Sequence, residues 1–161
     1  MKYCYLSLFL FFSMSMFAQS GATESEALVA KKDWSNDQVY KVVEQMPRFP
    51  GCEELEGSEQ DRKRCASDKL FEYISENLVY PEDALKQGIE GMAVVSFVIR
   101  SDSSVTDVKI VRDLAGGCGD SAASMVEGMN DLTEKWIPGS KDGENVSCIY
   151  TLPVTFRLKK K

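Results

Sequence analysis

The chain has 161 residues, 43% of them hydrophobic and 10% aromatic, which is enough to build one packed domain and a short additional segment. With 25 acidic and 19 basic residues its net charge is -6, which argues against binding to nucleic acid. Because the sequence contains no histidine, Ser-His and Cys-His catalytic pairs and imidazole metal sites are excluded, and we expect a binding protein without a cofactor rather than an enzyme.

Residues 1–19 predict a secretory signal peptide. Lys2 precedes an apolar run from Tyr5 to Phe17, and small or polar residues follow that run. An uncleaved membrane anchor is the alternative, although about 14 apolar residues at 1.5 Å each would reach only roughly 21 Å across a hydrocarbon core of ~30 Å. Residues 20–38 are polar and of mixed charge, and they predict a flexible leader before a domain at 39–161.

The cysteines indicate at least one disulfide. Of the five cysteines, Cys4 would be removed with the signal peptide, which leaves four. An even number in an exported chain favours disulfides, and four cysteines allow three pairings. We favour the pair Cys52 and Cys65, because the two lie close in sequence on either side of a polar loop, and closing that loop would stabilise the fold by about 3 kcal/mol. No Cys-x-x-Cys pair is present to support a zinc site. The pairing of Cys118 and Cys148 stays open.

The first elements expected in the domain are a short strand and two helices. Valines between residues 39 and 43 suggest the strand, and prolines at 47 and 50 end it. A helix is expected from an N-cap at Ser67 or Asp68 until residues 77–80, and Pro81 then begins a second, short helix that Gly88 ends. The apolar stripe of the first helix comprises Leu70, Phe71, Ile74 and Leu78.

Residues 92–100 give the strongest strand signal, a continuous β-branched and aromatic run that predicts a central strand. A turn at 101–104 leads to a second strand at 105–112, so the two strands form an antiparallel hairpin. Alternation in the second strand places Val105, Asp107 and Lys109 on one face and Thr106, Val108 and Ile110 on the other.

The C-terminal part predicts a helix and a last strand. Glycines between 116 and 119 form a turn, after which Asp120 caps a helix. The last strand, at 147–158, contains Pro153, whose missing N–H favours the edge of a sheet. One face of the helix comprises Ala122, Met125, Val126 and Met129, and one face of the strand comprises Cys148, Tyr150, Leu152, Val154, Phe156 and Leu158.

This order of elements predicts an α+β fold, a two-layer sandwich with an antiparallel sheet of three to four strands and two helices on one face. A long, unprotected edge strand in such a sheet can capture an extended peptide.

A set of motifs in one order resembles the C-terminal domain of the TonB family. Each motif is short, but together they extend over most of 39–161. The motifs are Tyr80-Pro81 with Ala84, Gly88 and Gly91, the hairpin with Asp102 and Val105, Arg112, Trp136-x-Pro138-Gly139, and Leu152-Pro153-Val154-x-Phe156-x-Leu158. Met46-Pro47-x-Phe49-Pro50-Gly51 and Gly116-Gly117-Cys118 resemble a large branch of that family.

The resemblance implies a periplasmic module that binds the TonB box of TonB-dependent outer-membrane transporters as an added strand and supports energy-dependent nutrient uptake. Inner-membrane motor proteins are the further partners that it implies. The expected partner-binding residues are Asn77, Leu78, Val79, Tyr80 and Pro81, and, in the last strand, Thr151, Leu152, Val154, Thr155, Phe156, Arg157 and Leu158. Phe97 and Trp136 are expected to be core aromatics.

The chain also departs from the family. TonB-type transducers carry an N-terminal membrane helix with a histidine and a proline-rich arm, whereas this chain has no histidine and a short apolar start. Ser103 stands where the family commonly has glycine in its Asp-Gly turn. A second hypothesis is therefore a free-standing periplasmic interaction domain whose edge strand pairs with itself, in a homodimer, or with another envelope protein. The mass of the mature N-terminus would separate the two hypotheses.

Overall fold

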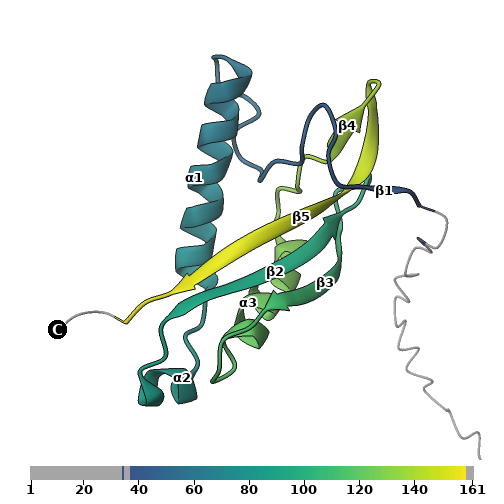
Figure 1. Ribbon diagram of the computed structural model, residues 1–161. Coiled ribbons are helices and arrows are strands. Elements are labelled where there is room, and N and C mark those ends of the chain that lie inside the picture. Colours follow the sequence, from purple (N-terminus) through teal and green to yellow (C-terminus); the bar gives the residue numbers. More distant parts are fainter. Residues whose placement is uncertain (1–33, 35–36, 159–161) are drawn as a thin grey trace, which may run out of the picture. The chain divides into compact units, whose positions relative to one another are not determined.

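The computed structural model describes Trp34 and residues 37–158, so the expected signal peptide and most of the leader lie outside the described residues. None of the helices in this part is both long and apolar enough to cross a membrane. Figure 1 shows the elements, which in chain order are β1 (Val39–Tyr40), α1 (Glu59–Asn77), α2 (Glu82–Gln87), β2 (Gly91–Ile99), β3 (Val105–Arg112), α3 (Cys118–Glu127), the 3-10 turn η1 (Gly128–Asp131), β4 (Gly139–Lys141) and β5 (Glu144–Phe156).

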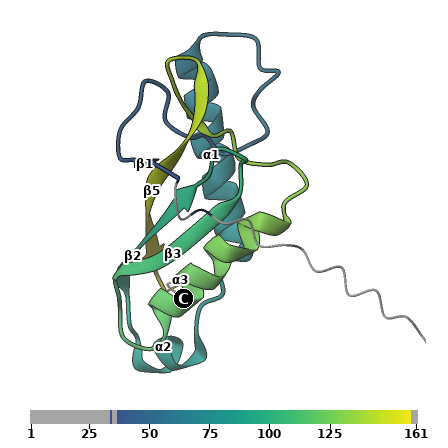
Figure 2. The same ribbon diagram turned by 90° about the vertical axis from the view of Figure 1, so that its right-hand side faces the viewer.

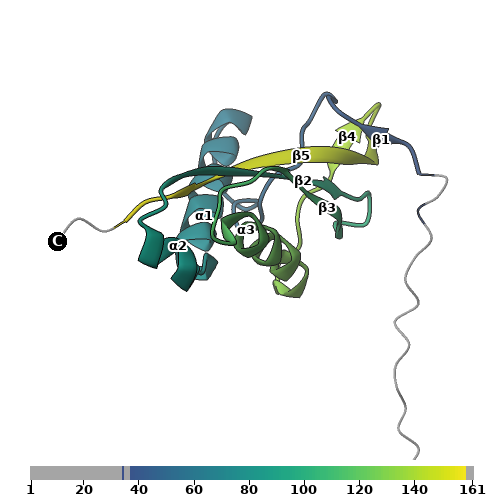
Figure 3. The ribbon, with the colours of Figure 1, turned by 60° about the horizontal axis from the view of Figure 1, so that its bottom comes forward.

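The three long strands form an antiparallel sheet in the order β5-β2-β3. The helices α2 and α3 lie on one side of this sheet (Figure 3), and α1 contributes Ala66 and Leu70 to the same core. The predicted two-layer α+β fold is thus confirmed. The short strand expected near residues 39–43 is present as β1, and it pairs parallel to β5. The strand β4, which forms a hairpin with the start of β5, was not expected, because a strand of three residues is too short to show a period.

The helix α1 begins at Glu59, so the predicted start at Ser67 or Asp68 is wrong. Ser58 is its N-cap: the Ser58 hydroxyl accepts from the Asp61 N–H at 3.2 Å, and the Asp61 carboxylate accepts from the Ser58 N–H at 2.9 Å. The first two turns carry polar, mostly exposed residues, and therefore show no apolar stripe. Cys65 consequently lies on the helix and not at the end of a loop.

The end of α1 and the short helix that follows agree with the sequence. The helix α1 stops at Asn77, and Gly88 ends α2 in the left-handed conformation with φ 66°. Pro81 had been expected as the first helical residue of α2, but it is the N-cap. In the predicted apolar stripe of α1, Leu70 is buried, but Phe71 is 66% exposed.

The hairpin of β2 and β3 is confirmed, but the expected alternation along β3 is wrong. Val105 is buried, and Val108, expected on the opposite face, packs against the same core. The cause is an irregularity at Asp107, which has φ 51° and lies where the pairing register shifts between Ser96 and Val98. A residue inserted in this way reverses the side on which the following side chains point, until the second register shift, opposite Val94 and Val95, reverses it again.

The helix α3 begins at Cys118, two residues before the predicted cap at Asp120, which lies in its first turn. The predicted glycine turn is confirmed. Gly117 is the N-cap with φ 79°, and a Cβ on Gly116 would lie 2.9 Å from the backbone of Ala84, so the turn can approach α2 only with glycine there. The predicted apolar residues Ala122, Met125, Val126 and Met129 are all buried.

The aromatic core confirms the expectation for Phe97 and Trp136, each 1% exposed. The Trp136 ring packs against the rings of Phe49, Phe97 and Tyr150, with centroids 5.2 to 5.9 Å apart. These contacts join the segment before α1 to the strands β2 and β5. In the described part of the chain, the buried Trp136 indole N–H has no hydrogen-bond partner.

The disulfide predicted between Cys52 and Cys65 is present, with Cα atoms 6.0 Å apart. It ties the loop after Gly51 to the second turn of α1. Cys118 and Cys148 are both free and fully buried, and burial raises the pKa of both thiols. They therefore act as small apolar core residues in this structure.

A buried arginine joins the start of the described chain to the hairpin. Arg100 is 5% exposed, forms an ion pair with Asp37 at 3.0 Å and a second one with Asp107, and lies 4.9 Å from the centre of the Trp34 ring. The Ser147 hydroxyl at the start of β5 donates to Asp37 as well. Trp34 and Asp37, which fall in the segment expected as a flexible leader, thus contact the domain.

Candidate partner-binding site

The strand β5 has one open side along its C-terminal half. On one side β2 pairs with it continuously, from Gly91 opposite Phe156 to Ile99 opposite Cys148. Residues 144–146 pair with β4, before the pairing with β2 begins. On the side opposite β2, β1 pairs with residues 147–148. Beyond that point, from Ile149 to Phe156, no described strand pairs with this side, and Figure 1 shows it facing away from β2. The strand therefore leaves the main-chain groups of this stretch free for a further strand.

The direction of the amides along β5 can be read from Leu158, whose N–H donates to the Glu90 carboxylate at 2.6 Å, on the β2 side. Amides of successive residues in a strand point to opposite sides. The N–H groups of even-numbered residues therefore point to β2, and those of Thr151 and Thr155 point to the open side. Pro153 shares their parity, so its missing N–H is lost from the open side and leaves the pairing with β2 intact.

The side chains of the predicted strand residues divide between the core and the solvent. Leu152, Val154 and Phe156 are buried, with 1% to 5% exposure, and cannot contact a partner through their side chains. Thr151, Thr155 and Arg157 are exposed, and Leu158 is half-buried. A partner on this edge would thus be held mainly by main-chain hydrogen bonds, with the threonine side chains on the solvent face.

The second predicted segment, 77–81, meets the end of β5 through Tyr80. The Tyr80 ring packs edge-on against Phe156 with centroids 5.3 Å apart, and its hydroxyl donates to the Ile89 carbonyl at 2.5 Å. Desolvation raises the pKa of Tyr80, which keeps the phenol protonated as a donor. Tyr80 is therefore a structural link between the two predicted segments, and Val79 beside it is 71% exposed.

Asn77, Val79 and Pro81 line a hollow of about 490 Å³ on the helix side of the molecule. The opposite wall comes from α3, through Ser121, Ser124 and Met125. The Ser121 hydroxyl donates to the Val79 carbonyl, and the Asn77 amide donates to the Tyr73 carbonyl at 2.9 Å. The sequence did not predict that these α3 residues line the hollow. They belong to an amphipathic helix whose pattern gives no sign of a binding role. Leu78 is half-buried against the core.

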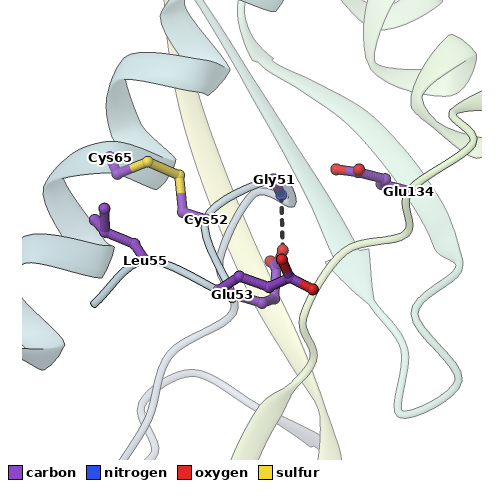
Figure 4. Close-up of a pocket in the computed structure, with 7 residues that line it drawn as sticks. Gly51, Cys52, Glu53, Leu55, Cys65 and Glu134 are labelled. Carbon is purple, nitrogen blue, oxygen red and sulfur yellow. Dashed lines mark hydrogen bonds between the residues drawn. A yellow bond between two sulfur atoms is a disulfide. The ribbon is translucent and has the colours of Figure 1, made fainter. Parts of the chain in front are cut away.

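A second hollow, of about 430 Å³, lies beside the disulfide (Figure 4). Glu53, Glu54 and Glu134 line it, and the Glu53 carboxylate accepts from the Gly51 N–H at 3.0 Å. Asp61, which is near these carboxylates in sequence, instead forms the capping box of α1 with Ser58. No cluster of three or more Cys, Asp or Glu side chains in the described part of the chain is placed to hold a metal ion. The open side of β5 is the stronger candidate for function.

Residues 76–158 match the family described as Gram-negative bacterial TonB protein C-terminal. Two curated relatives, each named Protein TonB and from the Helicobacter pylori strains J99 / ATCC 700824 and ATCC 700392 / 26695, are 48% identical over 44 residues, which is 27% of this chain. The match spans only 16% and 15% of the length of these relatives.

Two solved structures are similar as well. The solution structure of Helicobacter pylori TonB-CTD is 29% identical, over 59% of this chain and 82% of that chain, with a TM-score of 0.45. The solution structure of Pseudomonas aeruginosa TonB CTD is 24% identical, over 52% of this chain and 80% of that chain, with a TM-score of 0.36.

Proposed function

The chain belongs to the family of Gram-negative bacterial TonB C-terminal domains, and from that premise we propose that it binds the TonB box of outer-membrane transporters by strand addition to β5. The binding would take place in the periplasm and support energy-dependent nutrient uptake. Inner-membrane motor proteins would be further partners if residues 1–19 stay attached as an anchor, and a signal peptide that is cleaved would leave a soluble adaptor.

The observation that carries this proposal is the open, regular side of β5 from Ile149 to Phe156. Its pairing with β2 runs over nine residue pairs without a shift, so the strand is extended and its free groups are evenly spaced. The other edge strand, β3, has two register shifts and carries exposed Lys109 and Arg112. Bulges and charged residues are features that protect an edge against pairing. A guest strand is therefore expected at β5 and not at β3.

The segment 77–81 would provide a second contact. Val79 is exposed, and the next residue, Tyr80, fixes the segment to Phe156 near the end of β5. A transporter whose box lies along β5 would thus reach Asn77, Val79 and Pro81 with residues adjacent to the box. These contacts are side-chain contacts, so they would distinguish one transporter from another more than the main-chain pairing does.

The proposal is tested with Thr155→Pro. The Thr155 N–H points to the open side. Proline at this position therefore removes a β5 donor that would bond to a guest strand, and it leaves the hydrogen bonds between β5 and β2 intact. We expect at least a tenfold loss of affinity for a fluorescent TonB-box peptide, measured by anisotropy, with an unchanged circular dichroism spectrum. Thr155→Val, which keeps the N–H, is the control and should bind as the wild type does. Equal binding by Thr155→Pro, or no binding by the wild type, would contradict the proposal.

The alternative function, a domain whose β5 pairs with a second copy of itself, uses the same open side. Sedimentation of the full chain distinguishes the two: a dimer that Thr155→Pro converts to a monomer, with no binding of TonB-box peptides by the wild type, would favour self-pairing.

A further inference from the structure

Phe71 is a large aromatic side chain that the core does not use. It lies in the third turn of α1 and is 66% exposed, although its neighbours Leu70 and Ile74 pack against the core. An isolated exposed aromatic requires no explanation by itself. The position of Phe71 relative to β5, however, places its ring next to the space that a guest strand would occupy.

The direction of Phe71 follows from Tyr73, two residues later on the same helix. The Tyr73 hydroxyl donates to the Met125 carbonyl of α3 at 3.0 Å, so this side of α1 faces α3. Two residues correspond to about 200° around a helix, so Phe71 points to the opposite side. Because α3 packs against β3 and β2 (Figure 2), the side of α1 away from α3 is the side of the open β5 edge.

A hollow confirms that α1 and β5 bound the same space. Lys63, Ala66, Ser67 and Leu70 of α1 line a cavity of about 120 Å³ together with Tyr150 of β5 and the segment 46–49. Ser67 lies one helical turn before Phe71 on the same strip of the helix surface. Figure 1 shows α1 standing beside the open side of β5, with its C-terminal end close to the end of the strand.

A guest strand on β5 would lie about 4.8 Å from it, and every second side chain of the guest would point to the helix layer. The core-side residues of β5 are apolar, so guest side chains in the same layer would extend the core face of the sheet. In the helix layer beyond the β5 edge, the described structure supplies α1 with the Phe71 ring. Apolar side chains there would remove the ring from water, and polar ones would not.

We propose that Phe71 is a specificity residue that selects extended peptides with aliphatic side chains at alternate positions. This inference rests on the proposed function, since it needs the guest strand at β5. A single extended peptide fits beside β5, because it carries no helix that would occupy the space next to α1. Two copies paired through β5 about a twofold axis perpendicular to the sheet would each place an α1 beside the same edge, and these helices would compete for the same space.

The test uses two peptides of identical composition, one with valines at every second position between threonines and one with the valines in a single block. The wild type should bind the alternating peptide about tenfold more tightly in an anisotropy titration. Phe71→Ala should lose about tenfold in affinity for the alternating peptide and show little preference between the two. Val111→Ala, which removes an apolar side chain 63% exposed on β3, is the matched control and should bind as the wild type does.

The outcomes separate this inference from the proposed function. Phe71→Ala binding both peptides as the wild type does, while Thr155→Pro binds neither, would overturn the role of Phe71 and leave strand addition at β5 in place. Absence of binding of both peptides to the wild type would overturn both proposals. Because Phe71 is mostly exposed, its replacement should leave the thermal unfolding midpoint within a few degrees of the wild type, which excludes misfolding as the cause of a loss.

Discussion

Ser103 lies in the turn between β2 and β3 with φ 72°, a left-handed conformation that a side chain with a Cβ rarely adopts. The neighbouring Asp102 carboxylate accepts from the Ser104 N–H at 3.2 Å, so the tight turn is formed although glycine is missing. The left-handed backbone is the physical reason why the family commonly places glycine there, and the serine is tolerated at a cost in stability.

Ser103→Gly should raise the free energy of unfolding by about 1 kcal/mol, because glycine adopts this conformation without the steric penalty, although it also gains freedom in the unfolded chain. Urea denaturation followed by circular dichroism measures the change. Ser103→Ala keeps the Cβ and should give no gain. A gain with alanine as large as that with glycine would assign the effect to the hydroxyl and not to the backbone.

At the scale of elements, the first half of α1 is stabilised by its cap and by the disulfide and not by burial. Before Ala66 its residues are exposed or half-buried, so the capping box of Ser58 and Asp61 and the Cys52–Cys65 bond have to hold this part. The start of the helix is important for the binding proposal, because the hollow beside β5 is lined by Lys63, Ala66 and Ser67.

Ser58→Ala should lower the free energy of unfolding by about 1 kcal/mol at neutral pH. Hydrogen bonds from Ser58 hold the pKa of Asp61 below its usual value of 3.8, so the stabilisation by this carboxylate is complete above pH 3.8 and is lost as the pH falls through the lowered value. The difference between wild type and variant, measured by urea titration at several pH values, should therefore shrink in acid. A difference that stays constant down to pH 2 would contradict this account.

At the scale of the whole molecule, Arg100 joins the start of the described chain to the hairpin of β2 and β3. It binds Asp37 before β1 and Asp107 on β3, and it lies against the Trp34 ring. Since β1 pairs with β5 immediately beyond Asp37, this cluster also sets where the open side of β5 begins. The length of the proposed peptide site is thus determined by residues that come from the expected leader.

Arg100→Met should destabilise the fold by about 2 kcal/mol, because it leaves two carboxylates without their buried partner. Lys86→Met, which breaks the exposed pair with Glu82 at 3.1 Å, is the control and should change stability by less than about 0.5 kcal/mol. Denaturant titration measures both. Equal effects of the two variants would show that the Arg100 cluster is no stronger than a surface ion pair.

The sequence by itself determined the order of the elements, the hairpin, the core faces of α3 and β5, and the Cys52–Cys65 pair, because periodicity, turn residues and short loop closure are local properties of a chain. It misplaced the start of α1, whose first turns have no apolar period, and the alternation of β3, which the irregularity at Asp107 reverses.

Only the tertiary structure decided which part of β5 is open and what lies beside it. The strand β4 pairs with residues 144–146, β1 occupies the side opposite β2 at residues 147–148, and Pro153 leaves the open side with one donor fewer. Phe71, counted with the core from its spacing, is exposed because α1 extends beside the edge of the sheet, where no described strand covers it. Pairing and exposure depend on segments far apart in sequence, so no local pattern could reveal them.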